Sequence, residues 1–351
     1  MEQLRKKYID LLLNKCIYPK NKSLFISYDK ENFDFITLLI ERARELGFEH
    51  ILTDERDITL EHKLLKELSI DEIESHPYFY NEVWNQAVEG NYAFLIESTA
   101  FPHYFDDIED NKIIAANKTK AKTNTQYIES VMNDTISWTI FVLPNQLWAE
   151  TLFPNISDSY QKLEKLIYSF CMIDTHNPIE MWNQYIALEN EKTVYLNRLD
   201  IKEIVLKNSL GTSITISLPK NYIFRSLDNN HCIENIPTYS IWTLPHKYIV
   251  DGIIYGSMPI TYQDFHIEEF WFKFSNGKVI DYDAKVGKQY LDDFFSRGDS
   301  YMRLGEIAII DFDSPISKTG LIYQNNLLDE NVGTHLALGC AYQNTIQGGF
   351  I

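Results

Sequence analysis

The sequence predicts an α/β N-terminal domain built on a parallel sheet, followed by a mixed α+β, largely antiparallel C-terminal domain. The chain has 351 residues, which is more than one hydrophobic core usually supports. In the first half, apolar runs of strand length alternate with helical patterns, as in parallel sheets that are covered by helices. In the second half, apolar runs follow one another with short turns between them, which favours antiparallel pairing. We place the domains at residues 1–197 and 198–351.

The elements of the N-terminal domain follow from hydrophobic periodicity. The strands expected are "SLFISYD", "HILTD", "YAFLIES" and "ISWTIFVLP", and the helices expected cover 2–15, 32–48, 58–75, about 115–132 and most of 155–197. Gly47 is expected to end the second helix. Because no GxGxxG or Walker sequence follows the first strand, we expect this sheet to be architectural, without a nucleotide site.

The elements of the C-terminal domain are mostly strands. They are predicted at 202–208, 213–219, 249–256, 266–275, 278–284 and 305–313, with one helix at 287–299. Asn276-Gly277 stands between two alternating apolar runs, which is a strong signal for a tight hairpin.

The composition disfavours several classes of function. There are 50 acidic and 32 basic residues, giving a formal charge of −18, which disfavours nucleic acid and anionic lipid as partners. No apolar run reaches the roughly 18 residues of a membrane span, and the charged start of the chain does not read as a signal peptide. Cys16, Cys171, Cys232 and Cys340 match no metal spacing and are expected to be buried thiols in a reducing cytoplasm.

The residues with the clearest chemical meaning lie near the end of the sequence. Glu306 opens an apolar strand, where a charge is costly unless it is paired or binds a metal. His335 opens an apolar segment, and Tyr342 follows seven residues later, on the same face if that segment is helical. Glutamate and histidine are zinc-type ligands, and a phenol can donate to an oxyanion. A histidine in this context is more often a core residue than a ligand.

The motifs around these residues resemble the aminopeptidase T family of thermophilic metallo-aminopeptidases. The segments that carry the resemblance are "RLGE.A", "DSPIS.TGL", "LLDEN...HLALG.AY" and, upstream, "SWTIFVLPNQLWAETLFP", "NIPT" and "VDGIIYGSMPITY". They occur in the family's order and span essentially the whole chain. The resemblance implies a two-metal exopeptidase that removes N-terminal amino acids from peptides, with Zn, Co or Mn as cofactor. It also implies a homodimer.

The resemblance implies a ligand set that this sequence matches only in part. Glu306 and His335 match a glutamate and a histidine ligand, and Tyr342 matches the catalytic tyrosine. A block of the form NIPTEE reads "NIPTYS" here, so Tyr239 and Ser240 stand where acids are expected. The family's final His-x-Asp strand would follow the last residue, Ile351. Two divalent ions need several anionic oxygens around them, and a neutral serine at 240 is a poor replacement.

Other side chains could supply replacement ligands, although each also has an ordinary structural interpretation. Those considered are Asp329, Glu330, His231, Cys232, His246, His266, Glu268 and Glu269. Asp329 and Glu330 belong to the family's "DEN" block and are expected to be structural or to face substrate. Ser314 and Ser317 lie in a predicted turn without a GxSxG elbow. Cys340 has no evident base beside it.

Three hypotheses about function remain open at this stage. The favoured one is a member of the family with impaired catalysis, a pseudoenzyme that binds small peptides, amino acids or a partner subunit. The alternative is an active metallo-aminopeptidase that uses replacement ligands. The third is that the sequence is shortened at its C-terminus, so that the His-x-Asp strand is missing for that reason.

Overall fold

The computed structural model describes residues 2–18, 21–227 and 232–347 and divides the chain into two compact units. The first comprises residues 1–186 and 227–238, and the second comprises 187–226 and 239–351. These limits differ from the predicted division. Helix α10 (Pro178–Arg198) begins in the first unit and ends in the second, and a short later segment returns to the first.

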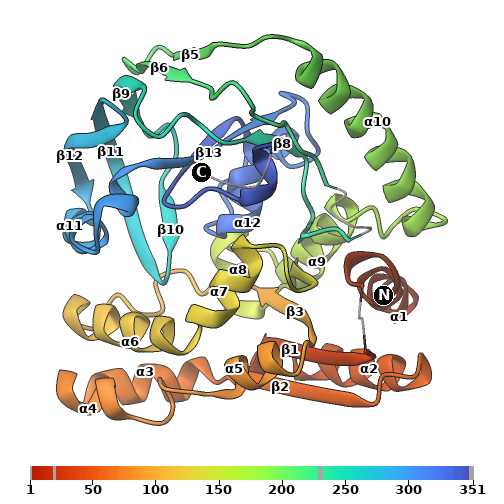
Figure 1. Ribbon diagram of the computed structural model, residues 1–351. Coiled ribbons are helices and arrows are strands. Elements are labelled where there is room, and N and C mark those ends of the chain that lie inside the picture. The colour runs from red at the N-terminus through yellow and green to blue at the C-terminus, as the bar shows by residue number, and fades with distance from the viewer. Residues whose placement is uncertain (1, 19–20, 228–231, 348–351) are drawn as a thin grey trace. The chain divides into compact units, whose positions relative to one another are not determined.

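The first unit is built on a parallel sheet, which confirms the predicted α/β class. Its strand order is β2-β1-β3-β4-β7, and every pair is parallel. Its strands are β1 (Ser23–Asp29), β2 (His50–Arg56), β3 (Ala93–Ser98), β4 (Trp138–Val142) and β7 (Asn235–Ile236). Leu24, Phe25 and Ile26 of β1 are fully buried, as expected for a strand covered on both faces. β1 and β2 run side by side in Figure 1.

The helices of the first unit are α1 (Glu2–Leu11), α2 (Phe33–Glu45), α3 (Ile58–Glu67), α4 (Ile70–Ser75), α5 (Val83–Glu89), α6 (Asp110–Thr123), α7 (Thr125–Met132), α8 (Gln146–Leu152) and α9 (Ser159–Phe170). α2 ends before Gly47, which has φ +84°, as predicted. Two predicted helices are each divided in two. Ser69 interrupts one, because its side chain and that of Glu72 form a capping box for α4.

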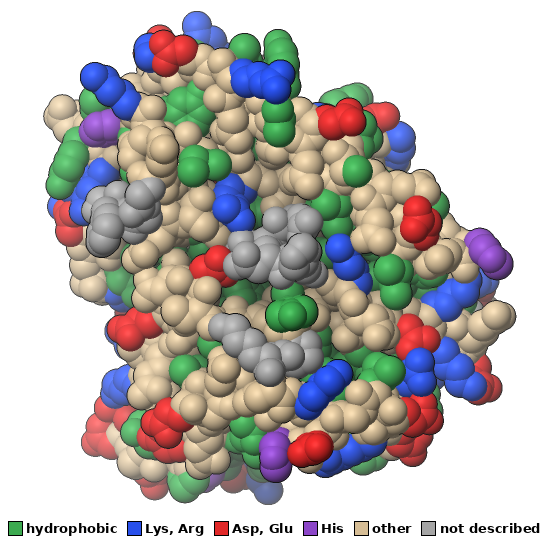
Figure 2. Space-filling model, turned by 45° about the vertical axis from the view of Figure 1, so that its right-hand side comes forward, with side chains coloured by type: hydrophobic (Ala, Val, Ile, Leu, Met, Phe, Trp, Pro, Cys, Tyr) green, Lys and Arg blue, Asp and Glu red, His purple; other side chains and the backbone are tan. Residues whose placement is uncertain are grey.

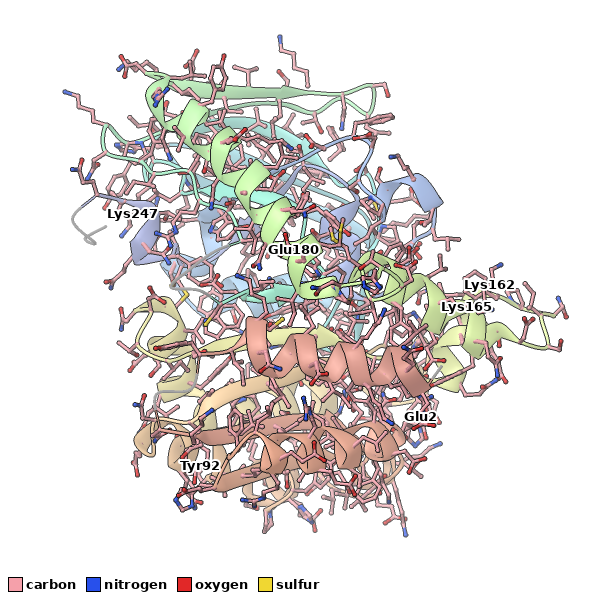
Figure 3. All side chains as sticks on the ribbon, turned by 90° about the vertical axis from the view of Figure 1, so that its right-hand side faces the viewer. Glu2, Tyr92, Lys162, Lys165, Glu180 and Lys247 are labelled. Carbon is pink, nitrogen blue, oxygen red and sulfur yellow. The ribbon has the colours of Figure 1, made fainter. Side chains whose placement is uncertain are left out.

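Helix α9 shows how the apolar stripe selects the buried face. Leu163 and Ile167 are fully buried, whereas Lys162 and Lys165 are exposed and lie on the outer side of the helix (Figure 3). The predicted helix 2–15 is α1 followed by a π-helical turn, Leu12–Cys16.

The second unit contains a larger antiparallel sheet with the order β10-β11-β9-β6-β5, and β12 also pairs with β11. Its strands are β5 (Glu203–Lys207), β6 (Ser213–Ser217), β9 (Val250–Tyr255), β10 (Ile260–Tyr262), β11 (Phe265–Ser275) and β12 (Lys278–Val286). Asn276 and Gly277 have φ +51° and +74°, which confirms the predicted hairpin turn. α11 (Lys288–Ser296) contacts β11 and β12 (Figure 1).

A smaller antiparallel sheet in the second unit has the order β14-β13-β8. It comprises β8 (Ser240–Thr243), β13 (Leu304–Ile310) and β14 (His335–Leu338), and α12 (Asn326–Asp329) precedes β14. The conditional interpretation of His335 to Tyr342 as a helix is wrong. His335 opens a strand because it and the residues after it pair with β13.

The surface and the thiols agree with the sequence in most respects. Cys16, Cys171 and Cys232 are buried, but Cys340 is exposed, contrary to expectation, because it lies two residues beyond the end of the edge strand β14. Figure 2 shows acidic and basic side chains interspersed over the face in view. Among the described residues, no helix is long and apolar enough to cross a membrane.

Candidate metal and peptide site

The candidate site is one face of the three-stranded sheet. β13 is the central strand, and its residues Glu306, Ala308 and Ile310 share a face because they are two positions apart along the strand. Residues directly opposite in antiparallel strands project to the same side. His335 is opposite Ala308 on β14, so it lies on this face beside Glu306.

Glu306 and His335 are in contact. The Nε2 atom of His335 is 3.5 Å from Oε1 of Glu306, and its Nδ1 atom is 3.4 Å from the carbonyl oxygen of Gly333. The second contact suits an Nδ1–H donor and leaves Nε2 toward the carboxylate, the orientation that metal-binding histidines commonly show. Burial would lower the pKa of His335. The hydrogen bond that His335 donates to Glu306 and the negative charges of Glu330 and Glu306 outweigh burial and raise the pKa of His335.

Glu330 is an acidic side chain, considered from the sequence as a replacement ligand, whose charge acts on this site. It lies five residues before His335 and is close enough for the two charges to interact. Burial raises the pKa of Glu330 to about 7; His335 opposes that rise, and the negative charges of Glu306 and Asp329 add to it. Because Glu330 belongs to the block Asp329-Glu330-Asn331, we expected it to be structural or to face substrate.

Ser240 is on the same face but farther along it. It is opposite Ile310, four residues beyond Glu306 on β13, which corresponds to about 13 Å along the strand. Two glutamate side chains with a pair of ions about 3.5–4 Å apart between them can bridge such a gap. Tyr239, the other substituted position, is buried, and its N–H donates to Oδ1 of Asn331 at 2.7 Å. The strand pairing therefore places position 240 where a second acid would be useful, and serine occupies it.

Tyr342 lies four residues beyond the end of β14. Its carbonyl oxygen accepts hydrogen bonds from the N–H and hydroxyl of Thr345, at the start of a short 3₁₀ helix (Gln343–Thr345). Its position relative to Glu306 and His335 is therefore set by the chain beyond the strand and not by strand pairing.

Most of the replacement ligands considered from the sequence have structural roles. The carboxylate of Asp329 accepts the backbone N–H groups of Tyr323 and Asn325, at 2.7 and 3.2 Å. Cys232 is buried in the first unit, with its sulfur 3.3 Å from Ser137 Oγ. His246 ends a turn, where its Nδ1 accepts the N–H of Tyr248. His231 lies outside the described residues.

The acids and histidine of β11 form a separate group. His266 Nε2 and Glu268 Oε1 are 2.6 Å apart. Glu269 is exposed, as predicted for at least one of the three, and pairs with Lys285. In the predicted turn, the buried Ser314 donates its hydroxyl to the Asn331 carbonyl and accepts the N–H of Ser317. These contacts shape loops and a hairpin and bring no further donor to Glu306.

The donors at the site do not fit a pair of metal ions. Within the part of the chain that the structure describes, no group of three or more His, Cys, Asp or Glu side chains is placed so that it could hold a metal. Glu306 and His335 supply two donors, whereas a paired centre needs several bridging and terminal ligands. We therefore derive no catalytic step through a metal pair from these residues.

Comparison with known proteins gives a consistent result. The sequence pattern of the family described as thermophilic metalloprotease (M29) matches residues 1–350. Aminopeptidase 2 of Geobacillus stearothermophilus is 28% identical over 98% of this chain and 85% of its own length. Aminopeptidase AmpS of Bacillus subtilis (strain 168) is 27% identical over 94% and 82%. The solved structure of wild-type AmpT from Thermus thermophilus matches with a TM-score of 0.85 and 25% identity, over 99% of this chain and 88% of that one.

Proposed function

Because this chain belongs to the thermophilic metalloprotease family M29, we propose that it is an aminopeptidase-type protein that binds short peptides by their free N-terminus but hydrolyses them poorly. A metalloprotease family implies a divalent metal, and its relatives here are named aminopeptidases. The observation that carries the proposed impairment is the donor set around Glu306 and His335, which lacks a third ligand among the described residues.

Charge compensation is the physical reason for impairment. Two divalent ions a few ångströms apart repel each other strongly unless carboxylates bridge them. Glu306 provides one such carboxylate, and Ser240 provides a neutral hydroxyl on the same face. A single Zn, Co or Mn ion would be held by Glu306 and His335, and its occupancy would be low.

The same residues suit a peptide's ammonium group. The carboxyl group of Glu306 is 3.5 Å from His335, and the negative charge of Glu330 acts on the same histidine. An ammonium group is a three-donor cation that such carboxyl groups can accept. We also propose, on the resemblance alone, that the protein is cytoplasmic and homodimeric.

One observation favours the alternative of an active enzyme. The charges of His335 and Glu306 act on Glu330, which would become a replacement ligand if its side chain moved to them. In that case, activity would depend on added metal and on all three residues, whereas the impaired form would have little activity to lose.

Metal analysis of untagged protein distinguishes the impaired protein from the active enzyme. We expect fewer than one Zn, Co or Mn per chain after dialysis, and slow release of p-nitroaniline from leucine p-nitroanilide with each metal. Ser240→Glu should increase the metal retained, because it adds a carboxylate to the face, and Ser240→Gln is its neutral control. Two ions held firmly by the wild-type protein, or hydrolysis that Glu306→Gln abolishes, would contradict the proposed impairment.

A further inference from the structure

Strand β5 is an open edge of the larger sheet in the second unit. The sheet has the order β10-β11-β9-β6-β5, and β6 is the only element that β5 contacts extensively within the described residues. The two strands lie side by side at one end of this sheet (Figure 1). A strand that is covered on one side only offers its remaining backbone N–H and C=O groups to another strand.

The backbone hydrogen bonds around β5 show which of its residues face outward. The carbonyl of Lys202 and the N–H of Asn208, directly before and after β5, are bonded at 2.9 and 3.3 Å to the residues that flank β6. Backbone groups alternate in direction along an antiparallel strand. The even-numbered residues are therefore bonded to β6, and the backbone groups of the odd-numbered residues point to the open edge. These residues are Glu203, Val205 and Lys207.

The side chains of the same three residues are exposed. Val205 stands at the centre of β5 and is 48% exposed. Glu203 and Lys207 form no ion pair within the described part of the chain, and the residues opposite them on β6 are serines. A lysine on an edge strand usually opposes pairing with other strands. Here a glutamate stands equally far from the centre on the other side, so the charges complement each other when the strand is reversed.

We propose that β5 pairs antiparallel with β5 of a second copy of this chain, about a twofold axis at Val205, so that the two larger sheets become continuous. Glu203 then lies opposite the partner's Lys207, and Val205 lies opposite the partner's Val205. All three opposite pairs exchange two N–H···O bonds each, because the backbone groups of these residues point outward. A twofold interface makes each unlike contact twice, so two ion pairs form.

The charges and the backbone select the same register. Moving the axis to Ile204 or Leu206 would leave two hydrogen-bonded pairs instead of three and would place each charge opposite an uncharged residue. With the axis at Val205, Ile204 lies opposite the partner's Leu206 on the other face of the strand. Both side chains pack against the hydrophobic core of the second unit, so the pairing extends that core.

The segments on either side of β5 add apolar surface to this edge. The axis brings the turn after β5 in one copy to the segment before β5 in the other. Each segment carries an exposed leucine, Leu210 at 54% and Leu199 at 39%. The inference is independent of the proposed peptide binding; it rests on the proposed homodimer, to which it gives a definite surface.

Charge reversal tests the pairing on the full chain. Glu203→Lys and Lys207→Glu each place two like-charged pairs in the interface, and the double variant exchanges the charges and restores both ion pairs. Sedimentation equilibrium at low salt measures the dissociation constant of the dimer. We expect each single variant to weaken the dimer about tenfold and the double variant to return to within about twofold of the wild type.

Val205→Pro tests the backbone part of the interface. Proline removes the outward N–H and leaves the hydrogen bonds to β6 in place, as proline does on other edge strands. We expect this variant to be monomeric at concentrations at which the wild type is a dimer. Lys285→Ala changes an exposed charge on β12 and should not alter the dimer. Far-UV circular dichroism checks that every variant keeps its fold.

The outcomes separate this inference from the proposed function. A wild-type protein that stays monomeric would overturn both the homodimer and this surface. A dimer that neither charge reversal weakens would overturn this surface alone, because other residues would then join the copies. Weakening by both single variants without recovery in the double variant would also overturn it. An intact dimer that binds no peptide would contradict the proposed function and leave this inference in place.

Discussion

Two clusters of charged side chains, one in each unit, show opposite treatments of a buried carboxylate. In the first unit, Glu61 is 2% exposed and is held by Arg56 at 2.7 Å and Lys120 at 2.5 Å. Burial alone would raise the pKa of Glu61, but the two positive charges outweigh it and lower the pKa to about 2. In this cluster the side chains of Arg56 and Lys120 neutralise the charge of Glu61, so no ligand is needed to do so.

The second cluster has the reverse balance. Glu306 is 3.5 Å from His335, the negative charge of Glu330 acts on the same histidine, and burial raises the pKa of Glu330 to about 7. A bound cation would stabilise the ionised form of this buried carboxyl group. The difference suggests that charge balance separates a structural cluster from a binding one in this protein.

The largest effect is expected when the compensated cluster is broken. Glu61→Gln would leave Arg56 and Lys120 facing a neutral group, and we expect a loss of about 3 kcal/mol in the free energy of unfolding. Urea denaturation at pH 7 measures the difference in the free energy of unfolding between wild type and variant. The pH dependence of that difference is the control. The lowered pKa means that the contribution of Glu61 is present above about pH 4.5 and is lost as the pH falls toward 2. A difference that persists at pH 2 would show that packing, not charge, is responsible.

A smaller effect of opposite sign is expected in the uncompensated cluster. The raised pKa of Glu330 means that wild-type stability falls as the pH rises from about 4.5 to 7 and then levels off. Glu330→Gln removes this loss. We expect it to stabilise the protein by roughly 2 kcal/mol at pH 8 and to have little effect at pH 4.5.

Denaturation of Glu330→Gln should be carried out with a chelator, so that no metal ion compensates the wild-type carboxylates. Destabilisation at pH 8 would mean that Glu330 already has enough positive charge around it. The two clusters would then not differ in the way that their buried carboxylates are neutralised.

The smallest effect is expected at the surface. Glu269 and Lys285 form an exposed ion pair between neighbouring strands, and both side chains are about two-thirds exposed. Lys285→Ala should leave the melting temperature unchanged within error, because solvent and salt screen such pairs. A marked decrease in the melting temperature, measured by differential scanning calorimetry, would show that this exposed pair contributes to stability.

The elements of the fold could be predicted largely from the sequence, since they depend on local pattern. The apolar run of β1 and the turn at Asn276-Gly277 appear where periodicity and glycine placed them. The errors have local causes as well: the capping box at Ser69 divided a helix, and His335 proved to open a strand. A short apolar run such as the one at His335 fits the period of a helix or of a strand, so only its pairing with β13 could show that it is a strand.

The candidate site could be predicted only in part. Glu306 and His335 were identified by residue type and resemblance, and they do lie in contact. Glu330 was considered only as one of several replacement ligands, because nothing in its neighbourhood along the chain relates it to the face that carries Glu306. β8, β13 and the segment before β14 are tens of residues apart, and their relation exists only in the sheet.

By itself, the sequence determined which segments form strands and helices, the acidic surface and the serine at position 240, because these depend on residue identity and short-range pattern. The tertiary structure decided which carboxylates are compensated and which are not. Electrostatic balance depends on distances of a few ångströms between residues far apart in the chain, and only folding sets those distances.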